Sequence, residues 1–417
     1  MIAEAGAPAG LARASLLRDG SFVRLCVGQA ISALGDKLSS LAIAVWILTQ
    51  REDGAIALGA IFAVRTIATS LLLILGGVFS DRLPRRAQMI GSQLVLGATI
   101  GTLALVPANA PLVVLLVLVA VAGAADAFLE PASRMLVVDL AGPERLESAN
   151  SLSTLVVRVA GLLGPALGGI LIATIGIPAT LMLDAASFAI GAMAVFTTRR
   201  MQHVPRTAPP ATVRTVLSEA HEGLRVTART RWLRAVLLSD LSQTFLAVAP
   251  WFVLLPIALI PRGATAYAFT ITAFAAGGLL GAMAPLKWKP RAIGRAALLS
   301  QSLFALPLVA LALDLPVSVI AASAFVGGFG ADLGAVLFVT GLQRGVPGPL
   351  LGRITALSSL GSIALLPAGF ALAGALVRPI GVGPILMTGV VVIVLATSTA
   401  LHTPGVAHMQ QPTAPPH

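Results

Sequence analysis

The residues of this sequence that could carry chemistry are a few carboxylates inside long apolar runs. They are Asp36, Asp126, Glu130, Asp240 and Asp332. An ionisable group among apolar residues is costly, and such groups commonly bind ions, protons or substrates. Asp126 and Glu130 are four residues apart, so on a helix they share one face. Two neighbouring carboxylates repel each other and favour holding one proton between them. These residues are therefore candidates for a site where protons and a cationic substrate compete.

The same carboxylates also have a structural interpretation. Lys37, Arg65 and Arg158 are basic residues in apolar segments, and Asp36 could pair with Arg65 or Arg158. Asp240 lies close to one end of its apolar run, where it would face water. The sequence leaves both interpretations open.

Other patterns that would indicate catalysis are missing from the sequence. The histidines lie in polar segments and form no metal-binding cluster, and Cys26 is the only cysteine. There is no glycine-rich phosphate loop and no nucleophile–base arrangement. We therefore expect neither an enzyme, nor a metal, nor a cofactor, and a proton gradient is the expected energy source.

The elements that must position the carboxylates are apolar helices. Of the residues, 57% are hydrophobic and 11% are charged, whereas a soluble domain has about 25% charged residues. A helix that spans a membrane needs about 20 apolar residues. We expect twelve such spans, at 22–49, 55–79, 87–107, 111–135, 149–174, 178–197, 232–260, 265–286, 292–313, 317–341, 352–376 and 380–401. Because backbone groups in lipid must be paired within each segment, the sequence predicts an all-α polytopic membrane protein.

The basic residues indicate the orientation of these spans. If the N-terminus is cytoplasmic, the inner segments contain 22 of the 28 Lys and Arg residues, and the outer loops contain only Arg51, Arg262 and Arg378. This asymmetry follows the positive-inside rule and predicts that both termini are cytoplasmic. The net charge of +11 is thus a topology signal, and we expect the partner to be the lipid bilayer and no nucleic acid.

The chain divides into two similar halves. We expect an N-terminal six-helix half at 1–200, a cytoplasmic linker with an amphipathic helix at 201–231, a C-terminal six-helix half at 232–401 and a disordered, Pro-rich tail at 402–417. The spacing from Asp36 to Asp240 is similar to that from Asp126 to Asp332. The similar spacing indicates a parallel internal repeat, as in some transporters.

Two short motifs point to a family. The stretch from Gly77 to Arg86, GVFSDRLPRR, resembles the signature G-x-x-x-D-R-x-G-R-R of the major facilitator superfamily, with Pro84 in place of the second glycine. The stretch GPALGG, which contains Gly164, Pro165, Gly168 and Gly169, resembles the fifth-helix signature of the superfamily's antiporters. Further stretches, GQAISALGDKLSSLAIAVWIL and EGLRVTARTRWLRAVLL, resemble the bacterial drug and siderophore exporter branch.

The resemblance implies roles for the first motif in gating. It implies that Asp81 meets the N-terminus of the eleventh helix near Leu351–Arg353. We also expect Arg82, Arg85 and Arg86 to pair with Asp139 at the end of the fourth helix. Such contacts would form in one state of the gate and break in the other. The alternative is that the arginines only anchor the topology.

The resemblance also implies a function. It predicts twelve helices, of which the first, fourth, seventh and tenth line a central cavity. Asp36, Asp126, Asp240 and Asp332 fall on these four helices and would therefore lie at the cavity. We expect a monomeric efflux transporter of the bacterial inner membrane, which exports hydrophobic or cationic small molecules by alternating access and proton antiport. A proton-coupled uptake symporter and a non-transporting membrane sensor are the alternatives.

Overall fold

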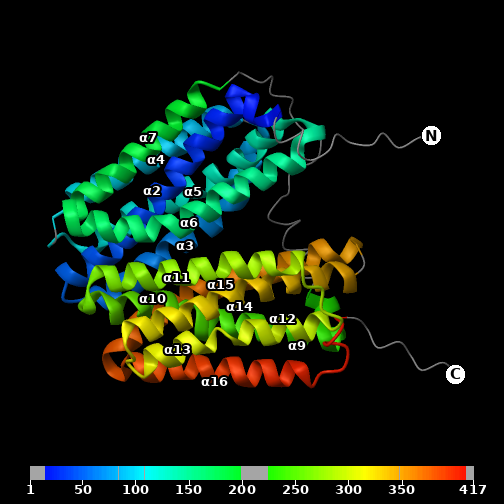
Figure 1. Cartoon of the computed structure of the whole chain (residues 1–417). Coiled ribbons are helices and arrows are strands. Elements are labelled where there is room, and N and C mark those ends of the chain that lie inside the picture. Colours follow the sequence, from blue (N-terminus) through cyan, green and yellow to red (C-terminus); the bar gives the residue numbers. More distant parts are fainter. Residues whose placement is uncertain (1–14, 83, 108, 199–223, 347, 410–417) are drawn as a thin grey trace, which may run out of the picture. The chain divides into compact units, whose positions relative to one another are not determined.

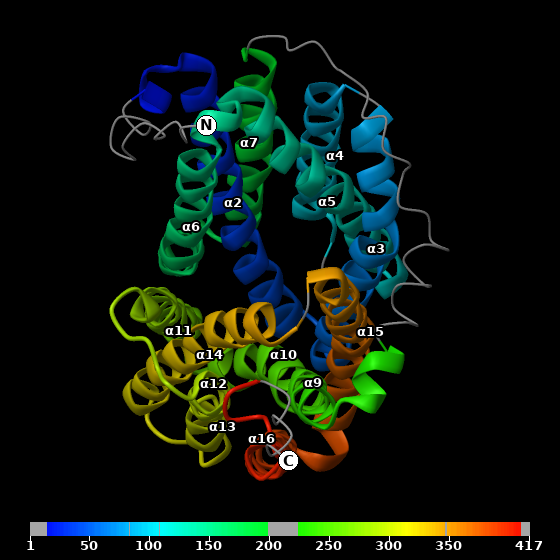
Figure 2. The ribbon, with the colours of Figure 1, turned by 90° about the vertical axis from the view of Figure 1, so that its right-hand side faces the viewer.

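The computed structural model describes residues 15–82, 84–107, 109–198, 224–346 and 348–409. These residues are helical and contain no β-strand. They group into two compact units (Figures 1 and 2). The first unit contains the described residues up to Trp46 and those from 64 to 198. The second contains residues 47–63, which comprise the end of the first long helix, a short turn and the start of the second, and the described residues from 224 onwards.

Six long helices begin in the first half of the chain. They are α2 (Gly20–Gln50), α3 (Gly54–Arg82), α4 (Arg85–Leu105), α5 (Leu112–Ala141), α6 (Leu146–Ile175) and α7 (Ile177–Phe196). In Figures 1 and 2, α4, α5 and α7 run alongside one another within the first unit. The last helix of this set begins directly after Gly176, whose φ of +83° suits glycine and lets the chain reverse within one residue.

The second unit contains the remaining helices. They are α9 (Arg231–Gln243), a π-helical turn (Thr244–Val248), α10 (Ala249–Leu259), α11 (Ala264–Met283), α12 (Ile293–Ser302), α13 (Ala305–Ala312), α14 (Val317–Gly345), α15 (Gly348–Ile380) and α16 (Val382–Leu401). Gly381, with φ +87°, joins α15 to α16 as Gly176 joins α6 to α7. Each glycine donates its backbone N–H to a carbonyl of the preceding helix, so the two halves end with the same kind of turn.

The expected fold class is confirmed. Among the described residues, eleven helices are long and apolar enough to cross a membrane, and a shorter apolar helix, Ala364–Ile380, lies within α15. The seventh expected span, 232–260, is continuous from α9 to α10 through the π-helical turn. That turn ends two residues before Pro250, which has no N–H to continue the regular α-helical pattern.

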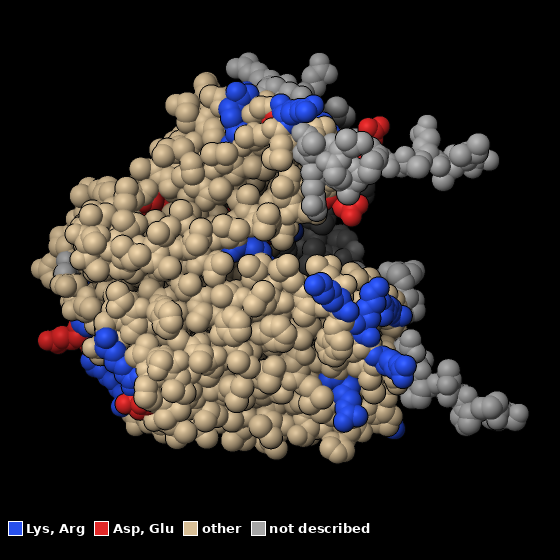
Figure 3. Space-filling model, viewed as in Figure 1, with Lys and Arg blue, Asp and Glu red and all other residues tan. Residues whose placement is uncertain are grey.

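The predicted domain boundaries lie partly outside the described residues. Residues 201–223 of the predicted linker lie outside the described residues, whereas residues 224–229 are helical. Apart from Asp240 and Asp332, the charged residues of the second unit lie near the ends of its helices, and the helix sides visible in Figure 3 are almost free of charge. This distribution is the one expected of helices whose sides face lipid.

The expectation of a disordered tail is wrong for residues 402–409. These residues form turns against α12 and α14, and Val406 and Met409 are fully buried. Three glycines, Gly294, Gly341 and Gly345, leave the space that Met409 fills. The burial of these two apolar side chains outweighs the Pro-rich composition of the segment. Residues 410–417 lie outside the described residues.

The second unit is built on close contacts between helix backbones. Gly277 and Gly281 of α11 lie against the backbone of Phe325 and Phe329 of α14, and Gly328 of α14 lies against the backbone of Phe274. Because glycine has no Cβ, the two helices approach more closely than side chains would allow.

Candidate functional site: an arginine that bridges two carboxylates

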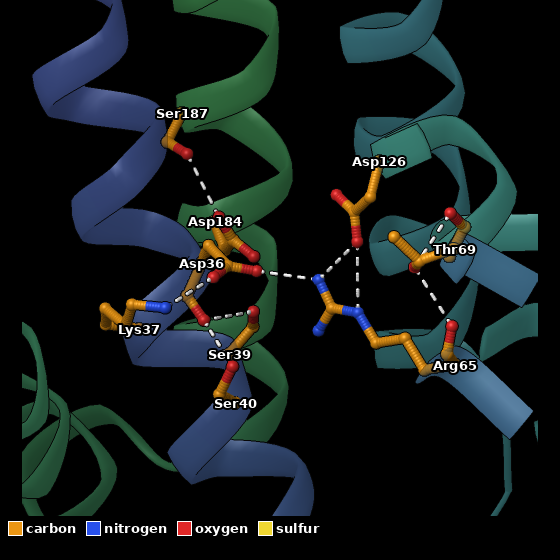
Figure 4. Close-up of polar contacts among 10 residues, drawn as sticks. Asp36, Lys37, Ser39, Ser40, Arg65, Thr69, Asp126, Asp184 and Ser187 are labelled. Carbon is orange, nitrogen blue, oxygen red and sulfur yellow. Dashed lines mark hydrogen bonds and ion pairs between the residues drawn. The ribbon is translucent and has the colours of Figure 1, made fainter. Parts of the chain in front are cut away.

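Arg65 of α3 binds carboxylates from two other helices of the first unit (Figure 4). Its Nη2 atom lies 2.8 Å from Oδ1 of Asp36 on α2 and 2.9 Å from Oδ2 of Asp126 on α5. Its Nε atom donates a second hydrogen bond to Oδ2 of Asp126, at 3.2 Å. One guanidinium therefore holds α2, α3 and α5 together through charge-assisted hydrogen bonds.

A second cation completes the site on α2. The Nζ atom of Lys37 lies 3.1 Å from Oδ2 of Asp36, so the two oxygens of Asp36 contact different cations. The side chains of Asp36, Arg65 and Asp126 are each about a quarter exposed, at 26%, 25% and 28%. The two carboxylates and two cations balance in charge, and their exposure allows exchange with water or a small ligand.

The position of Arg65 follows from a glycine on α5. A Cβ atom at Gly123 would lie 2.5 Å from the backbone oxygen of Arg65 and 3.1 Å from Cβ of Ala68. The hydroxyl of Thr69 donates hydrogen bonds to the backbone oxygens of Arg65 and Gly123, both at 3.0 Å. α3 therefore touches α5 just one helical turn before Asp126, which brings the guanidinium within reach of that carboxylate.

The position of Asp36 follows from small residues on α2 that face α7. A Cβ atom at Gly35 would collide with the side chains of Asp184 and Ser187, and one at Gly28 would lie 2.7 Å from Ala194. Asp184 is fully buried, and its Oδ1 accepts a hydrogen bond from Ser187 at 3.0 Å. Its Oδ2 has no hydrogen-bond partner among the described residues. Figure 4 shows Asp184 directly beside Asp36, so a third carboxyl group borders the ion pairs.

The GPALGG motif positions α2 from another side. Gly164 of α6 lies directly against Cβ of Lys37, and Gly168 lies against Leu38, 3.5 Å away. The motif therefore packs α6 closely against α2 within the first unit. Because it packs on Lys37, it also fixes the part of α2 that carries Asp36. Pro165 and Gly169 of the motif are buried on the same helix.

The expected pairing of Asp126 with Glu130 is not found. Glu130 forms an ion pair with Arg134, one turn further along α5, and both side chains are more than half exposed. Asp126 binds Arg65 instead. Although the two acids share a helix face, each is neutralised by a different arginine. Of the two arginines considered for Asp36, Arg65 forms the pair, and Arg158 is exposed on α6.

The acids of the second unit do not form a comparable site. Asp332 of α14 is half-buried, and a Cβ atom at Gly278 of α11 would lie 2.7 Å from its Oδ2. Asp240 is half-buried on α9, and its side chain forms no hydrogen bond or ion pair with another described residue. Each of these acids is on a different helix.

Part of the predicted gating motif holds α4 in place. Arg85 forms an ion pair with Asp139 of α5, as expected. Arg86 does not bind Asp139, because its guanidinium donates to the backbone oxygens of Val195 and Phe196 at the end of α7 and lies 5.2 Å from the centre of the Phe196 ring. Gly77, Asp81 and Arg82 are at the end of α3, and their side chains lie outside the described part of the structure.

Two members of the site were absent from the predicted set of transport residues. They are Lys37 and Asp184, two charged residues inside the expected spans. The sequence feature that could have indicated the contact of Asp184 with α2 is a stripe of small residues on α2. These residues recur at helical spacing and are Gly28, Ser32, Gly35 and Ser39. Such a stripe indicates a close helix contact but does not indicate which helix makes it.

Comparisons with known proteins bear on the family and the fold of the chain. The sequence model of the Major Facilitator Superfamily matches residues 25–364. The multidrug efflux pump Tap of Mycolicibacterium fortuitum is 27% identical, over 84% of this chain and 90% of that protein.

Solved structures share the fold. The nucleoside transporter NupG superimposes with a TM-score of 0.72 at 13% identity, over 91% of this chain and 99% of that one. A bacterial homologue of the iron transporter ferroportin, in an inward-facing state, superimposes with a TM-score of 0.71 at 17% identity, over 93% of this chain and 98% of that one.

Proposed function

The chain belongs to the major facilitator superfamily, and on this premise we propose that it is an efflux transporter that exports hydrophobic or cationic small molecules in exchange for protons. It is a multi-pass membrane protein and a non-enzymatic transporter. The observation that carries the proposal is the bridge from Arg65 to Asp36 and Asp126. The name of the relative Tap supports export and the class of cargo.

The bridge provides a chemical basis for exchange. When a proton neutralises Asp126 or Asp36, that carboxyl group loses its charge-assisted bonds to Arg65. The contact between α3 and that helix then weakens, while the contact to the other carboxylate remains. A site with these alternative pairings can exist in two arrangements that differ in which helices are joined.

The bridge also provides a basis for competition. Arg65 is itself an organic cation bound between two carboxylates, so the site already has the geometry and charge that a cationic cargo requires. A cargo cation that takes the place of Arg65 at either carboxylate would be released when a proton binds there. Protons and cargo would then occupy the site in turn, as antiport requires.

The basic residues support an orientation for this exchange. We propose that both termini and the segments rich in Lys and Arg face the cytoplasm, in the inner membrane of a bacterium. The proton gradient across that membrane is directed inward, so it would drive cargo outward.

Proton exchange in everted membrane vesicles tests the proposal. Vesicles that contain the chain are energised until their interior is acidic, and an interior pH dye is followed as lipophilic cations and neutral compounds are added. We expect added cations to release protons through the wild type and not through Asp126→Asn. The matched control is Glu130→Gln on the same helix, because Glu130 pairs only with the exposed Arg134.

The outcomes separate the alternatives. Cargo uptake into everted vesicles without proton release would exclude antiport. Cargo movement out of the vesicles together with protons would indicate an uptake symporter. Equal proton release from the wild type and from Asp126→Asn would remove Asp126 from the coupling site.

A further inference from the structure

The segment that joins α11 to α12 is basic, aromatic and exposed. Leu286 is 76% exposed and Trp288 is 47% exposed. Four basic side chains surround them and are also exposed, namely Lys287, Lys289, Arg291 and Arg295. The sequence contains no acidic residue between Asp240 and Asp314, so this segment has no acid of its own to neutralise it.

The corresponding segment of the first half differs. Between α3 and α4, Arg85 binds Asp139, and Arg86 binds the backbone oxygens at the end of α7. In the segment between α11 and α12, no other described residue forms a hydrogen bond or ion pair with the four basic side chains. Among the described residues, nothing therefore neutralises their charge.

The backbone of this segment is fixed, and only its side chains are available. The N–H groups of Gly294 and Arg295 in the first turn of α12 donate to the backbone oxygen of Ala407, at 3.0 and 3.3 Å. The tail that contains Ala407 is held by the buried Met409. The start of α12 is thus already capped, and an anion would be bound by the basic side chains.

The combination of residues indicates a phospholipid. Tryptophan and leucine at the end of a membrane helix lie at the boundary between headgroups and acyl chains, and nearby Lys and Arg residues attract anionic headgroups. We propose that residues 286–295 bind an anionic phospholipid, with the basic side chains at its phosphate and Leu286 and Trp288 against its acyl chains. An inorganic phosphate would use the basic residues and leave both apolar side chains uncovered.

Quenching of Trp288 by brominated lipid tests this proposal without any measurement of transport. The full chain is reconstituted in phosphatidylcholine that contains a small fraction of brominated phosphatidylglycerol or brominated phosphatidylcholine. The variant Trp288→Phe keeps the half-buried Trp46 and the buried Trp232 and Trp251, so the difference between it and the wild type gives the contribution of Trp288. We expect the brominated anionic lipid to associate at least about fivefold more strongly than the zwitterionic one, the effect of one basic residue near an anionic surface.

Two charge variants complete the test. In the combined variant Lys287→Gln, Lys289→Gln, Arg291→Gln and Arg295→Gln, both brominated lipids should quench Trp288 equally. The matched control, Arg225→Gln, Arg229→Gln, Arg231→Gln and Arg344→Gln, removes as many exposed charges elsewhere and should keep the preference.

Equal quenching of the wild type by both lipids would overturn the proposal. The proposal would also be overturned if the combined variant kept the preference for the anionic lipid. The same holds if the control variant lost that preference to the same extent. Because every substituted residue is exposed, both variants should fold, and native mass spectrometry of lipids bound to the wild type gives an independent measurement.

Discussion

The two units of this protein treat charge differently. In the first, Asp36, Lys37, Arg65 and Asp126 form one connected set inside the helices, with Asp184 beside it. In the second, Asp240 and Asp332 are on separate helices, and the rings of Trp251, Phe274 and Phe304 form a tilted and edge-to-face cluster, with centroids 5.8 to 6.4 Å apart. Although the halves share their order of helices, the connected ion pairs that join α2, α3 and α5 lie in the first.

The largest expected effect follows from removing the shared cation. Arg65→Ala would leave Asp36 and Asp126 without their bridge, and breaking a buried pair costs about 3–5 kcal/mol. Because these side chains are about a quarter exposed, we expect about 2 kcal/mol and at least a tenfold loss of transport. Thermal unfolding and vesicle exchange measure the two effects.

The control for this prediction is Arg65→Lys. A lysine keeps the charge but has no planar fork, so it cannot bind both carboxylates as arginine does. We expect stability close to the wild type with reduced transport. Full transport by Arg65→Ala would contradict the importance of the bridge.

The second prediction compares the same change in both units. Asp126→Asn should abolish cargo-dependent proton release, because an amide cannot exchange the proton. Asp240→Asn, in the second unit, should change it by less than about twofold, since no described cation pairs with the Asp240 carboxylate and the substitution therefore breaks no ion pair. The comparison between the units fails if Asp240→Asn has the larger effect in the vesicle assay.

The third prediction concerns the packing of the second unit. Gly277→Ala would place a Cβ atom against the backbone oxygen of Phe325, which cannot move aside as a side chain could. We expect a loss of about 1–3 kcal/mol in stability, with proton coupling retained in the folded fraction. Gly161→Ala is the matched control, because a Cβ atom there meets nothing within 4 Å. Unfolding in detergent measures both, and an unchanged midpoint for Gly277→Ala would disprove the prediction.

The smallest expected effect is the change in stability on losing an ion pair at the surface of the second unit. Arg51 donates to both oxygens of Asp53, at 2.8 and 3.2 Å, and these hydrogen bonds lower the pKa of Asp53. A lowered pKa stabilises the folded state above the ordinary pKa of about 4, and this contribution disappears as the pH falls through the folded-state pKa.

The Asp53 pair is more than a third exposed on the carboxylate side, so we expect at most a few tenths of a kcal/mol. Asp53→Asn should unfold at the same temperature as the wild type at pH 3 and slightly below it at pH 7. A difference that grows towards acid pH would reverse the assigned sign.

The sequence predicted the helices well because lipid imposes a strong constraint on them. Long apolar runs gave the spans, and one of the two arginines considered for Asp36 proved to be its partner. The sequence predicted less well which carboxylates act together. The spacing of Asp126 and Glu130 placed both on one face, but it could not show that Arg65 and Arg134 would approach them separately. Likewise, composition suggested a disordered tail, because the glycines that accommodate Met409 lie far away in the sequence.

The glycine contacts between α11 and α14 constrain the biogenesis of the second unit. A chain is synthesised from its N-terminus, so α11 is made first, and α12 and α13 follow before α14 is available. Until then Gly277 and Gly281 have no backbone to pack against and form a notch that lipid must fill. The emergence of α14 is therefore the step that fills this notch, and a chain arrested before it would keep the glycine face of α11 open.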